Sequence, residues 1–406
     1  MELATRVLVI AAVLAGLGRT ASADVVSDWN AMAVASGYAA GLLPPAHMRN
    51  VALVHVALFD AINSIAPRYT PYRVRLPAEP GTSRDAAAAA AAHFLLIRMY
   101  PGQAKELDAL LQSSLSGVPN GQSRERGMQL GEQVAAAILA ERKADGSEAP
   151  NTYRPFTTPG TYVPTLFPIA TSWGSVKPFA LKTGSQFRPA GPYALTSSQW
   201  TADYNEVKRM GAKTGSQRSA EQTEIARFWE YTGPGTYNPV VRQVAAAKQL
   251  QLSESARLFA LVAMAGADAM IAVMDAKYAY NFWRPVTAIR NGDLDGNDAT
   301  DRDPAWEPFI TTPMHPEYPC AHCITQAAVA TVLEAEFGNA VPTITLTSPT
   351  APGASRHYVR LSDYVAEVVN ARVYDGVHYR ISGEVGAAMG RQIGAYTVQN
   401  SLKPVR

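Results

Sequence analysis

The chain has 406 residues, of which 47% are hydrophobic and 17% are charged, enough apolar material for one large core or two moderate cores. The formal net charge is only +2 and the basic residues are scattered, which argues against a nucleic-acid-binding protein. We therefore expect a folded globular protein whose anionic ligands are small and bound locally.

The amino terminus has the pattern of a bacterial signal peptide. An apolar run over residues 7–18 is followed by Ala21-Ser22-Ala23, which fits the small-residue rule for cleavage after Ala23. The run is shorter than the roughly 20 residues that cross a bilayer as a helix. The apolar stretch 256–274 carries Asp268 and is better explained as a buried helix. We expect residues 1–23 to be removed and the mature chain to be exported, periplasmic or extracellular, without a membrane span.

Apolar residues recur at spacings of three and four, and alternating stretches are almost absent, which predicts an all-α protein. A first helix is expected from Pro44-Pro45 to about Ile65. Ser83 is placed to cap an Ala-rich helix that runs to Met99. Two more helices are expected before Gly146.

Residues 149–195 form a connection rich in Pro, Gly, Thr and aromatic residues, a composition that does not sustain a helix. Helices are expected to start at Ser197 and Ser219, and Ser253 is expected to open the longest helix, ending near Lys277. We predict an amino-terminal helical region over residues 24–250, which includes this connection, and a second region over residues 251–406.

Three segments of the second region carry residues suited to anion chemistry. Lys277 precedes Arg284 by seven residues, at the predicted end of the long helix. His322 stands at the predicted start of a helix over 324–337, where free backbone N–H groups favour an anion. Arg372 and His378 flank a predicted bend at Gly376. Taken singly, each cation is better explained as surface charge and each histidine as a buried imidazole bonded to a carbonyl.

In order and internal spacing the three segments resemble the signature of the vanadium haloperoxidase and type 2 phosphatidic acid phosphatase superfamily. That signature reads Lys, six residues, Arg-Pro; then Pro-Ser-Gly-His; then Ser-Arg, five residues, His. Residues 25–30 and 54–63 also resemble exported bacterial haloperoxidase-like proteins. The resemblance implies helical bundles, with a catalytic core at 251–406 and a second, amino-terminal helical part.

The resemblance also implies roles for the site residues. The cations Lys277, Arg284 and Arg372 would hold the equatorial oxygens of vanadate or of phosphate in the same site, and His378 would bind the metal at the apical position. His322 would be the acid–base residue. Backbone N–H groups near Cys320 and Ala321 would complete the cradle.

The implied activity is that of a haloperoxidase that needs vanadate and no haem. Hydrogen peroxide would be activated with help from His322 and Lys277, a halide would be oxidised to hypohalous acid, and an organic acceptor would be halogenated. Bromide is favoured because it is easier to oxidise than chloride. Two alternatives use the same oxyanion site: an exported acid phosphatase, and a catalytically silent oxyanion-binding protein.

Three positions depart from the family pattern. Cys320 and Ala371 stand where serines are expected, and Ser382 stands where the family often has the aspartate that orients the apical histidine. Asp375 or Glu384 could replace that carboxylate. Cys320 and Cys323, the only cysteines, leave three interpretations open. They could form a disulfide or redox pair, remain two free thiols, or belong to a metal site with the histidines near them in sequence, His315, His322 and His357.

Overall fold

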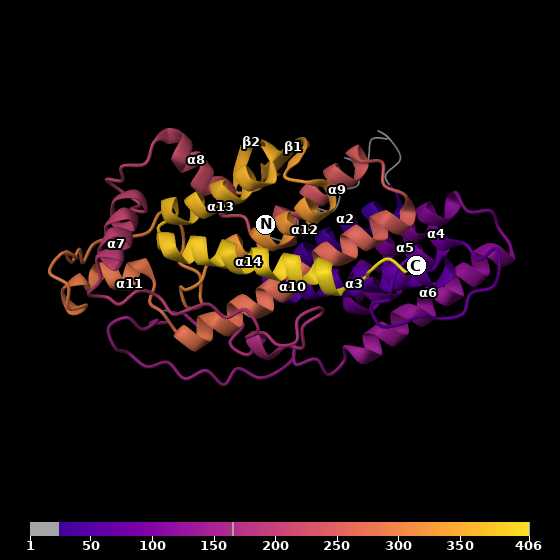
Figure 1. Cartoon of the computed structure of the whole chain (residues 1–406), viewed down its shortest axis with the longest axis horizontal. Helices are drawn as coiled ribbons and strands as arrows, with labels where there is room; N and C mark the ends of the chain where they lie inside the picture. Colours follow the sequence, from indigo (N-terminus) through magenta and orange to yellow (C-terminus); the bar gives the residue numbers. More distant parts are fainter. Residues whose placement is uncertain (1–23, 165, 406) are drawn as a thin grey trace. The chain divides into compact units, whose positions relative to one another are not determined.

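The structure is a computed structural model that describes residues 24–164 and 166–405 (Figure 1). The predicted signal peptide, residues 1–23, lies outside the described residues. Helices dominate, which confirms the predicted all-α class of helical bundles. The chain divides into two compact units, and the second comprises residues 146–232 and 268–396. The predicted domain boundary near residue 250 stays a prediction.

The first unit is built from helices of residues 24–145 and 233–267, with residues 397–406. The Ala-rich face of α4 packs against both α3 and α6, and small side chains allow this close approach. Ser83 caps α4 as predicted, since its hydroxyl accepts from the amide of Ala86. The helices are α2 (Val25–Ala39), α3 (Pro44–Ile65), α4 (Arg84–Met99), α5 (Ala104–Ser116), α6 (Gln122–Glu141) and α9 (Asn238–Ala247), with the 3-10 turns η1 (Pro101–Gln103) and η3 (Pro234–Thr236).

The second unit carries most of the remaining helices and one hairpin. Ser197 and Ser219 cap α7 and α8 as predicted, and Ser219 forms a capping box with Gln222. The helices are α7 (Ser198–Met210), α8 (Ala220–Trp229), α11 (Pro285–Arg290), α12 (Ala321–Phe337), α13 (Leu361–Tyr374) and α14 (Arg380–Asn400), whose last residues belong to the first unit; the 3-10 turns are η2 (Trp173–Ser175) and η4 (Gly292–Leu294).

The expectation that strands are almost absent is wrong at one place. An antiparallel hairpin joins β1 (Ala340–Ser348) to β2 (Ala351–Arg360). The inward side chains of Val341, Ile344 and Leu346 are buried and alternate with exposed residues, the period of a half-buried strand. The hairpin contacts α8, α12 and α13.

The longest helix is α10 (Leu252–Tyr280), which starts and ends close to the predicted positions. Among the described helices it is the one long and apolar enough to cross a membrane, and 94% of its most apolar window is buried within the protein, as in a core helix. Its buried Asp268 accepts hydrogen bonds of 2.6–2.8 Å from three consecutive backbone amides, those of residues 179–181. The 149–195 connection, which contains no α-helix, is thereby fixed to the helix that carries Lys277.

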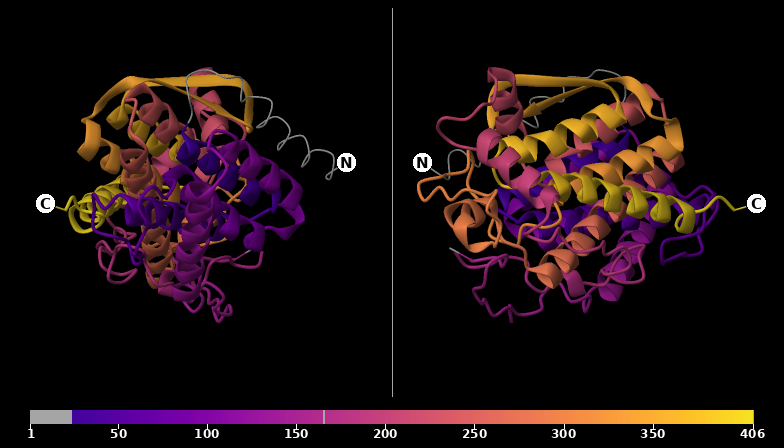
Figure 2. Two further views of the ribbon diagram at one scale, coloured as in Figure 1. Left: turned by 90° about the vertical axis from the view of Figure 1, so that its right-hand side faces the viewer. Right: turned by 60° about the vertical axis from the view of Figure 1, so that its left-hand side comes forward.

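Helices α12, α13 and α14 lie side by side (Figures 1 and 2). Three glycines of α14 at intervals of four residues, Gly386, Gly390 and Gly394, face α12. A Cβ atom on Gly390 would stand 2.2 Å from the carbonyl oxygen of Ile324, so only glycine allows this approach. The close contact sets the amino-terminal end of α12 beside the start of α14, where two predicted site segments meet.

Candidate functional site

Lys277, Arg284 and Arg372 are all buried in the second unit. Lys277 Nζ donates to the carbonyls of Pro316 and Glu317 at 2.9 and 2.7 Å. Burial, followed by the charge of Arg284, holds the pKa of Lys277 well below its usual value. The charges of Arg284 and Arg372 both act on Lys277, so the three predicted cations are close neighbours.

Arg284 links this cation cluster to two histidines. Its guanidinium donates to the carbonyls of His315 and Val377 at 3.0 and 2.7 Å, and lies 3.0 Å from His315 Nδ1. It also lies 3.3 Å from Nε2 of His378. Burial lowers its pKa to about 10, so the guanidinium stays charged at neutral pH. The pattern fixes Arg284 as a rigid donor next to the predicted apical histidine.

His378 is oriented by a buried carboxylate that the sequence analysis did not select. Its Nδ1 donates to Oε1 of Glu317 at 2.8 Å. The same carboxylate accepts from the amide of Tyr379 at 3.0 Å and from the hydroxyl of Ser382 at 2.6 Å. With its proton on Nδ1, His378 presents an unprotonated Nε2 on the Arg284 side.

The two carboxylates suggested from the sequence do not orient His378. Asp375 pairs with Arg372, and burial raises the pKa of Asp375 to about 7. Glu384 is exposed. Glu317 stands three residues before Cys320, and its position between two prolines gave no periodic signal. Only the fold shows that it reaches His378.

Arg372 lies in the last turn of α13 and contacts the end of α8. It donates to the carbonyl of Trp229 at 2.9 Å and forms an ion pair with Asp375. Its buried Nε has no partner among the described residues. An unsatisfied donor on a buried guanidinium is costly unless a ligand accepts from it, so this atom suits an oxyanion.

His322 stands in the first turn of α12, as predicted. Its Nε2 donates a hydrogen bond of 3.2 Å to the carbonyl of Tyr231, which leaves Nδ1 as the unprotonated nitrogen. Burial and the charge of Arg372 hold the pKa of His322 well below its usual value. The ring is therefore neutral at pH 7.

Cys320 and Cys323 form a disulfide, which settles one of the open interpretations. The alternative of two free thiols is wrong for this structure, and no group of His, Cys, Asp and Glu that could hold a metal ion occurs within the described chain. The predicted oxyanion contact of Cys320 is also wrong, because its sulfur carries no proton and its amide donates to the carbonyl of Ser382. The amide of Ala321, at the first position of α12, remains directed out of the helix end.

The charge balance of the cluster favours an anion. Three buried cations face two carboxyls, and burial raises the pKa of Glu317, like that of Asp375, to about 7. Burial lowers the pKa values of three histidines in the cluster, so their rings are neutral and do not offset the cations. These are His315, His322 and His378. The donor set therefore fits a compact, multiply charged oxyanion such as vanadate or phosphate.

Comparisons with known proteins find vanadium haloperoxidases. Residues 257–406 match the family model described as the second helical-bundle domain of vanadium chloroperoxidase. The chain is 27% identical over 387 residues to the vanadium chloroperoxidase of Curvularia inaequalis. The chain is therefore similar to vanadium haloperoxidases in its carboxy-terminal part and along most of its sequence. The alignment covers 74% of this chain and 62% of that relative, so the chain matches less than two thirds of the relative's length.

Solved structures of bacterial vanadium haloperoxidases share the fold. A bacterial vanadium-dependent iodoperoxidase superposes with a TM-score of 0.82 at 22% identity, covering 96% of this chain and 98% of that one. An apo-type bacterial vanadium-dependent chloroperoxidase superposes with a TM-score of 0.72 at 18% identity, covering 88% and 92%. These likenesses establish the helical vanadium haloperoxidase fold for this chain.

Proposed function

We propose that this protein oxidises a halide with hydrogen peroxide, using vanadate held by His378, Lys277, Arg284 and Arg372. The observation that carries the proposal is the hydrogen bond from His378 Nδ1 to Glu317, which leaves Nε2 unprotonated beside three buried cations. An unprotonated imidazole nitrogen can bind a metal ion. Buried cationic side chains bind anionic ligands.

The roles follow from the atoms that each residue presents within the cluster. His378 Nε2 would bind the metal, and the cations with the amide of Ala321 would hold the oxygens. Vanadate, when bound, supplies a Lewis acid that activates hydrogen peroxide without changing its own oxidation state. His322 would take a proton from hydrogen peroxide on Nδ1, since Nε2 is bonded to Tyr231. Lys277 would keep the reacting oxygen polarised.

The finer features are also proposals. We favour bromide over chloride because bromide is easier to oxidise, and we expect hypohalous acid to be the first product. The apolar run and the Ala-Ser-Ala site at residues 7–23 support export to the periplasm or the outside of the cell. Halide, hydrogen peroxide and an organic acceptor are the expected small-molecule partners.

The test is halogenation by protein that has first been stripped of bound oxyanions. Bromination of a simple diketone with bromide and hydrogen peroxide is measured with and without added orthovanadate, and hydrolysis of an aryl phosphate is measured in parallel. The proposal expects bromination only with orthovanadate. Aryl phosphate hydrolysis without bromination would make the chain a phosphatase, and tight orthovanadate binding without either reaction would make it a silent oxyanion-binding protein.

A further inference from the structure

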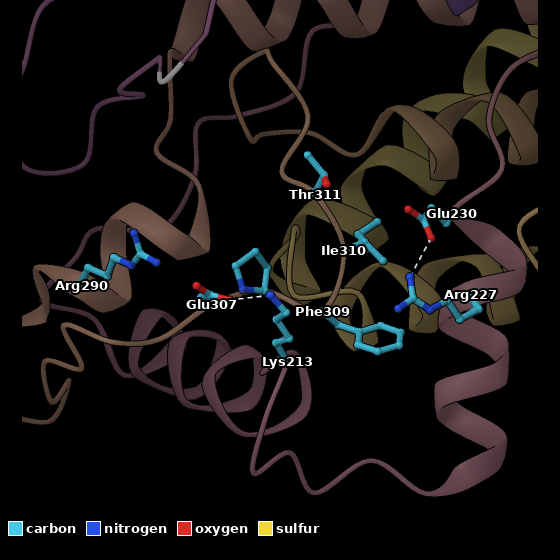
Figure 3. Close-up of a pocket in the computed structure, with 9 residues that line it drawn as sticks. Lys213, Arg227, Glu230, Arg290, Glu307, Phe309, Ile310 and Thr311 are labelled. Carbon is cyan, nitrogen blue, oxygen red and sulfur yellow. Dashed lines mark hydrogen bonds and ion pairs between the residues drawn. The ribbon is translucent and has the colours of Figure 1, made fainter. Parts of the chain in front are cut away.

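A second, open cavity of about 400 Å³ lies in the same unit as the oxyanion cluster (Figure 3). Three cationic side chains, two carboxylates and the ring of Phe309 line it. Its principal residues are Lys213, Arg227, Glu230, Arg290, Glu307 and Phe309. The volume lies within the range of small-molecule sites.

The walls of this cavity are fixed by backbone contacts. The amide of Lys213 donates to the carbonyl of Glu307, and the amide of Phe309 donates to the carbonyl of Gly211, both at 2.9 Å. A β-bridge between Ala212 and Pro308 lies between these two bonds. Lys213, Glu307 and Phe309 therefore stand on two paired backbone segments, while Arg227 and Glu230 come from the end of α8 and Arg290 from the end of α11.

Among the three cations of the cavity, Arg290 is the one with no carboxylate at salt-bridge distance in the described residues, although its charge acts on Glu307. Lys213 is paired with Glu307 at 2.8 Å, and Arg227 with Glu230 at 3.1 Å. Arg290 uses only Nε, which donates to the carbonyl of Trp306 at 2.9 Å, and its two terminal nitrogens have no partner in the described ranges. A planar guanidinium with two free donors is suited to bind a carboxylate.

The opposite side of the cavity offers a flat surface. The guanidinium carbons of Arg218 and Arg227 both lie 4.2 Å from the centre of the Phe309 ring. The Arg227 side chain nevertheless keeps 46% of its surface exposed. Stacked arginine and phenylalanine planes favour an aromatic ligand. Arg290 and Arg227 extend from opposite sides of the cavity in Figure 3.

The cavity is joined to the oxyanion cluster by short covalent and hydrogen-bonded links. Glu230 is followed by Tyr231, whose carbonyl contacts His322. The amide of Ile310 donates to the carbonyl of Asp375, the partner of Arg372. The charges of Arg218, Arg227 and Glu230 all act on the Asp375 carboxyl. A ligand in the cavity thus stands one layer of residues from Arg372.

We propose that this cavity binds a small aromatic carboxylate, with Arg290 holding the carboxylate and Arg227 with Phe309 contacting the ring. That the bound molecule is the acceptor of halogenation rests on the proposed function; the binding itself does not.

The test measures binding of 4-hydroxybenzoate by calorimetry to vanadate-free protein without halide or peroxide. Arg290→Gln removes the free guanidinium, and Arg209→Gln removes an equally positive but exposed residue of α7 that does not line the cavity. Wild type and Arg209→Gln should bind alike, while Arg290→Gln should weaken binding by about tenfold, the loss expected for one charge-assisted hydrogen bond. Phe309→Leu should weaken 4-hydroxybenzoate and neutral phenol together.

The outcomes separate the two proposals. Equal binding by wild type and Arg290→Gln, binding of phenol as tight as that of 4-hydroxybenzoate, or no saturable binding would each overturn the cavity assignment. For enzyme that turns over, the KM for 4-hydroxybenzoate should rise in Arg290→Gln while triiodide formation from iodide stays unchanged. Binding that depends on Arg290 in a protein without halogenation would overturn the proposed function and leave the cavity assignment standing.

Discussion

Nδ1 of His378 lies 2.8 Å from Oε1 of Glu317, and Ser382 donates to the other oxygen of the same carboxylate at 2.6 Å. Ser382 occupies the position at which the family often has an aspartate. In this chain the carboxyl group that contacts His378 comes from the segment before α12, and the serine hydroxyl donates to it. One carboxylate consequently ties together the segments that begin α12 and α14.

Replacement of Glu317 by Gln should change how stability depends on pH. Burial raises the pKa of Glu317 from 4.5 to about 7, so ionising it costs folding free energy. Its contribution is therefore fully present below about pH 4.5 and lost as pH rises through about 7. The melting temperature of wild type minus that of Glu317→Gln should decline over this range, measured without oxyanion. Glu384→Gln, at an exposed carboxylate of α14, should show no such decline, and a flat difference for Glu317→Gln would contradict the assignment.

Replacement of His378 by Ala should remove the proposed metal ligand and lower vanadate-dependent kcat/KM by roughly 10⁴-fold or more. His357→Ala offers a control, since His357 lies exposed on β2. Steady-state bromination and far-ultraviolet circular dichroism would be recorded for both. If His378→Ala keeps its turnover with intact helices, the shared site is wrongly placed.

The disulfide should weaken oxyanion binding, because neither sulfur can donate a hydrogen bond. The double variant Cys320→Ser with Cys323→Ser restores the family's hydroxyl and should bind phosphate roughly three- to tenfold more tightly than the oxidised wild type. Phosphate is the probe because thiol reductants leave it intact. Calorimetry would measure the phosphate affinity of wild type with and without reductant and of the double variant, to show whether only wild type responds to reduction. Equal phosphate affinities in all three samples would count against a hydrogen-bond donor at this position.

Replacement of Gly376 by Ala should destabilise the second unit strongly. Gly376 has a φ of 76°, and an added Cβ would stand 2.3 Å from the carbonyl oxygen of Gly211. Backbone strain and overpacking together should cost about 3 kcal/mol. Gly41→Ala tests strain alone, since φ is 68° in the left-handed turn that ends α2 but no atom lies within 4 Å, and it should cost about 1 kcal/mol. Urea unfolding of both variants would measure these costs, and similar values would mean that the contact with Gly211 yields easily.

The sequence predicted those features that depend on local chemistry. The caps at Ser83, Ser197 and Ser219, and the long helix ending near Lys277, follow from hydroxyls and apolar spacing. The hairpin at 340–360 was missed, although Thr343 to Thr347 alternates, because one short alternating run is a weak signal beside many helical ones. Glu317 was missed for another reason: its contact with His378 spans 61 residues and depends on the packing of α14 against α12.

Asp268 is the first of several side chains of α10 that fix the irregular 149–195 connection to this helix. Its carboxylate accepts hydrogen bonds from three successive amides at residues 179–181. Arg188 pairs with Asp275, about two helical turns further along α10. Tyr280 extends the same series by donating to the carbonyl of Pro189. The segment is thus attached to α10 through these three side chains. Backbone cleavage between these contacts should leave both cut ends attached to α10. The fold should therefore depend more on these side chains of α10 than on an unbroken backbone in this segment.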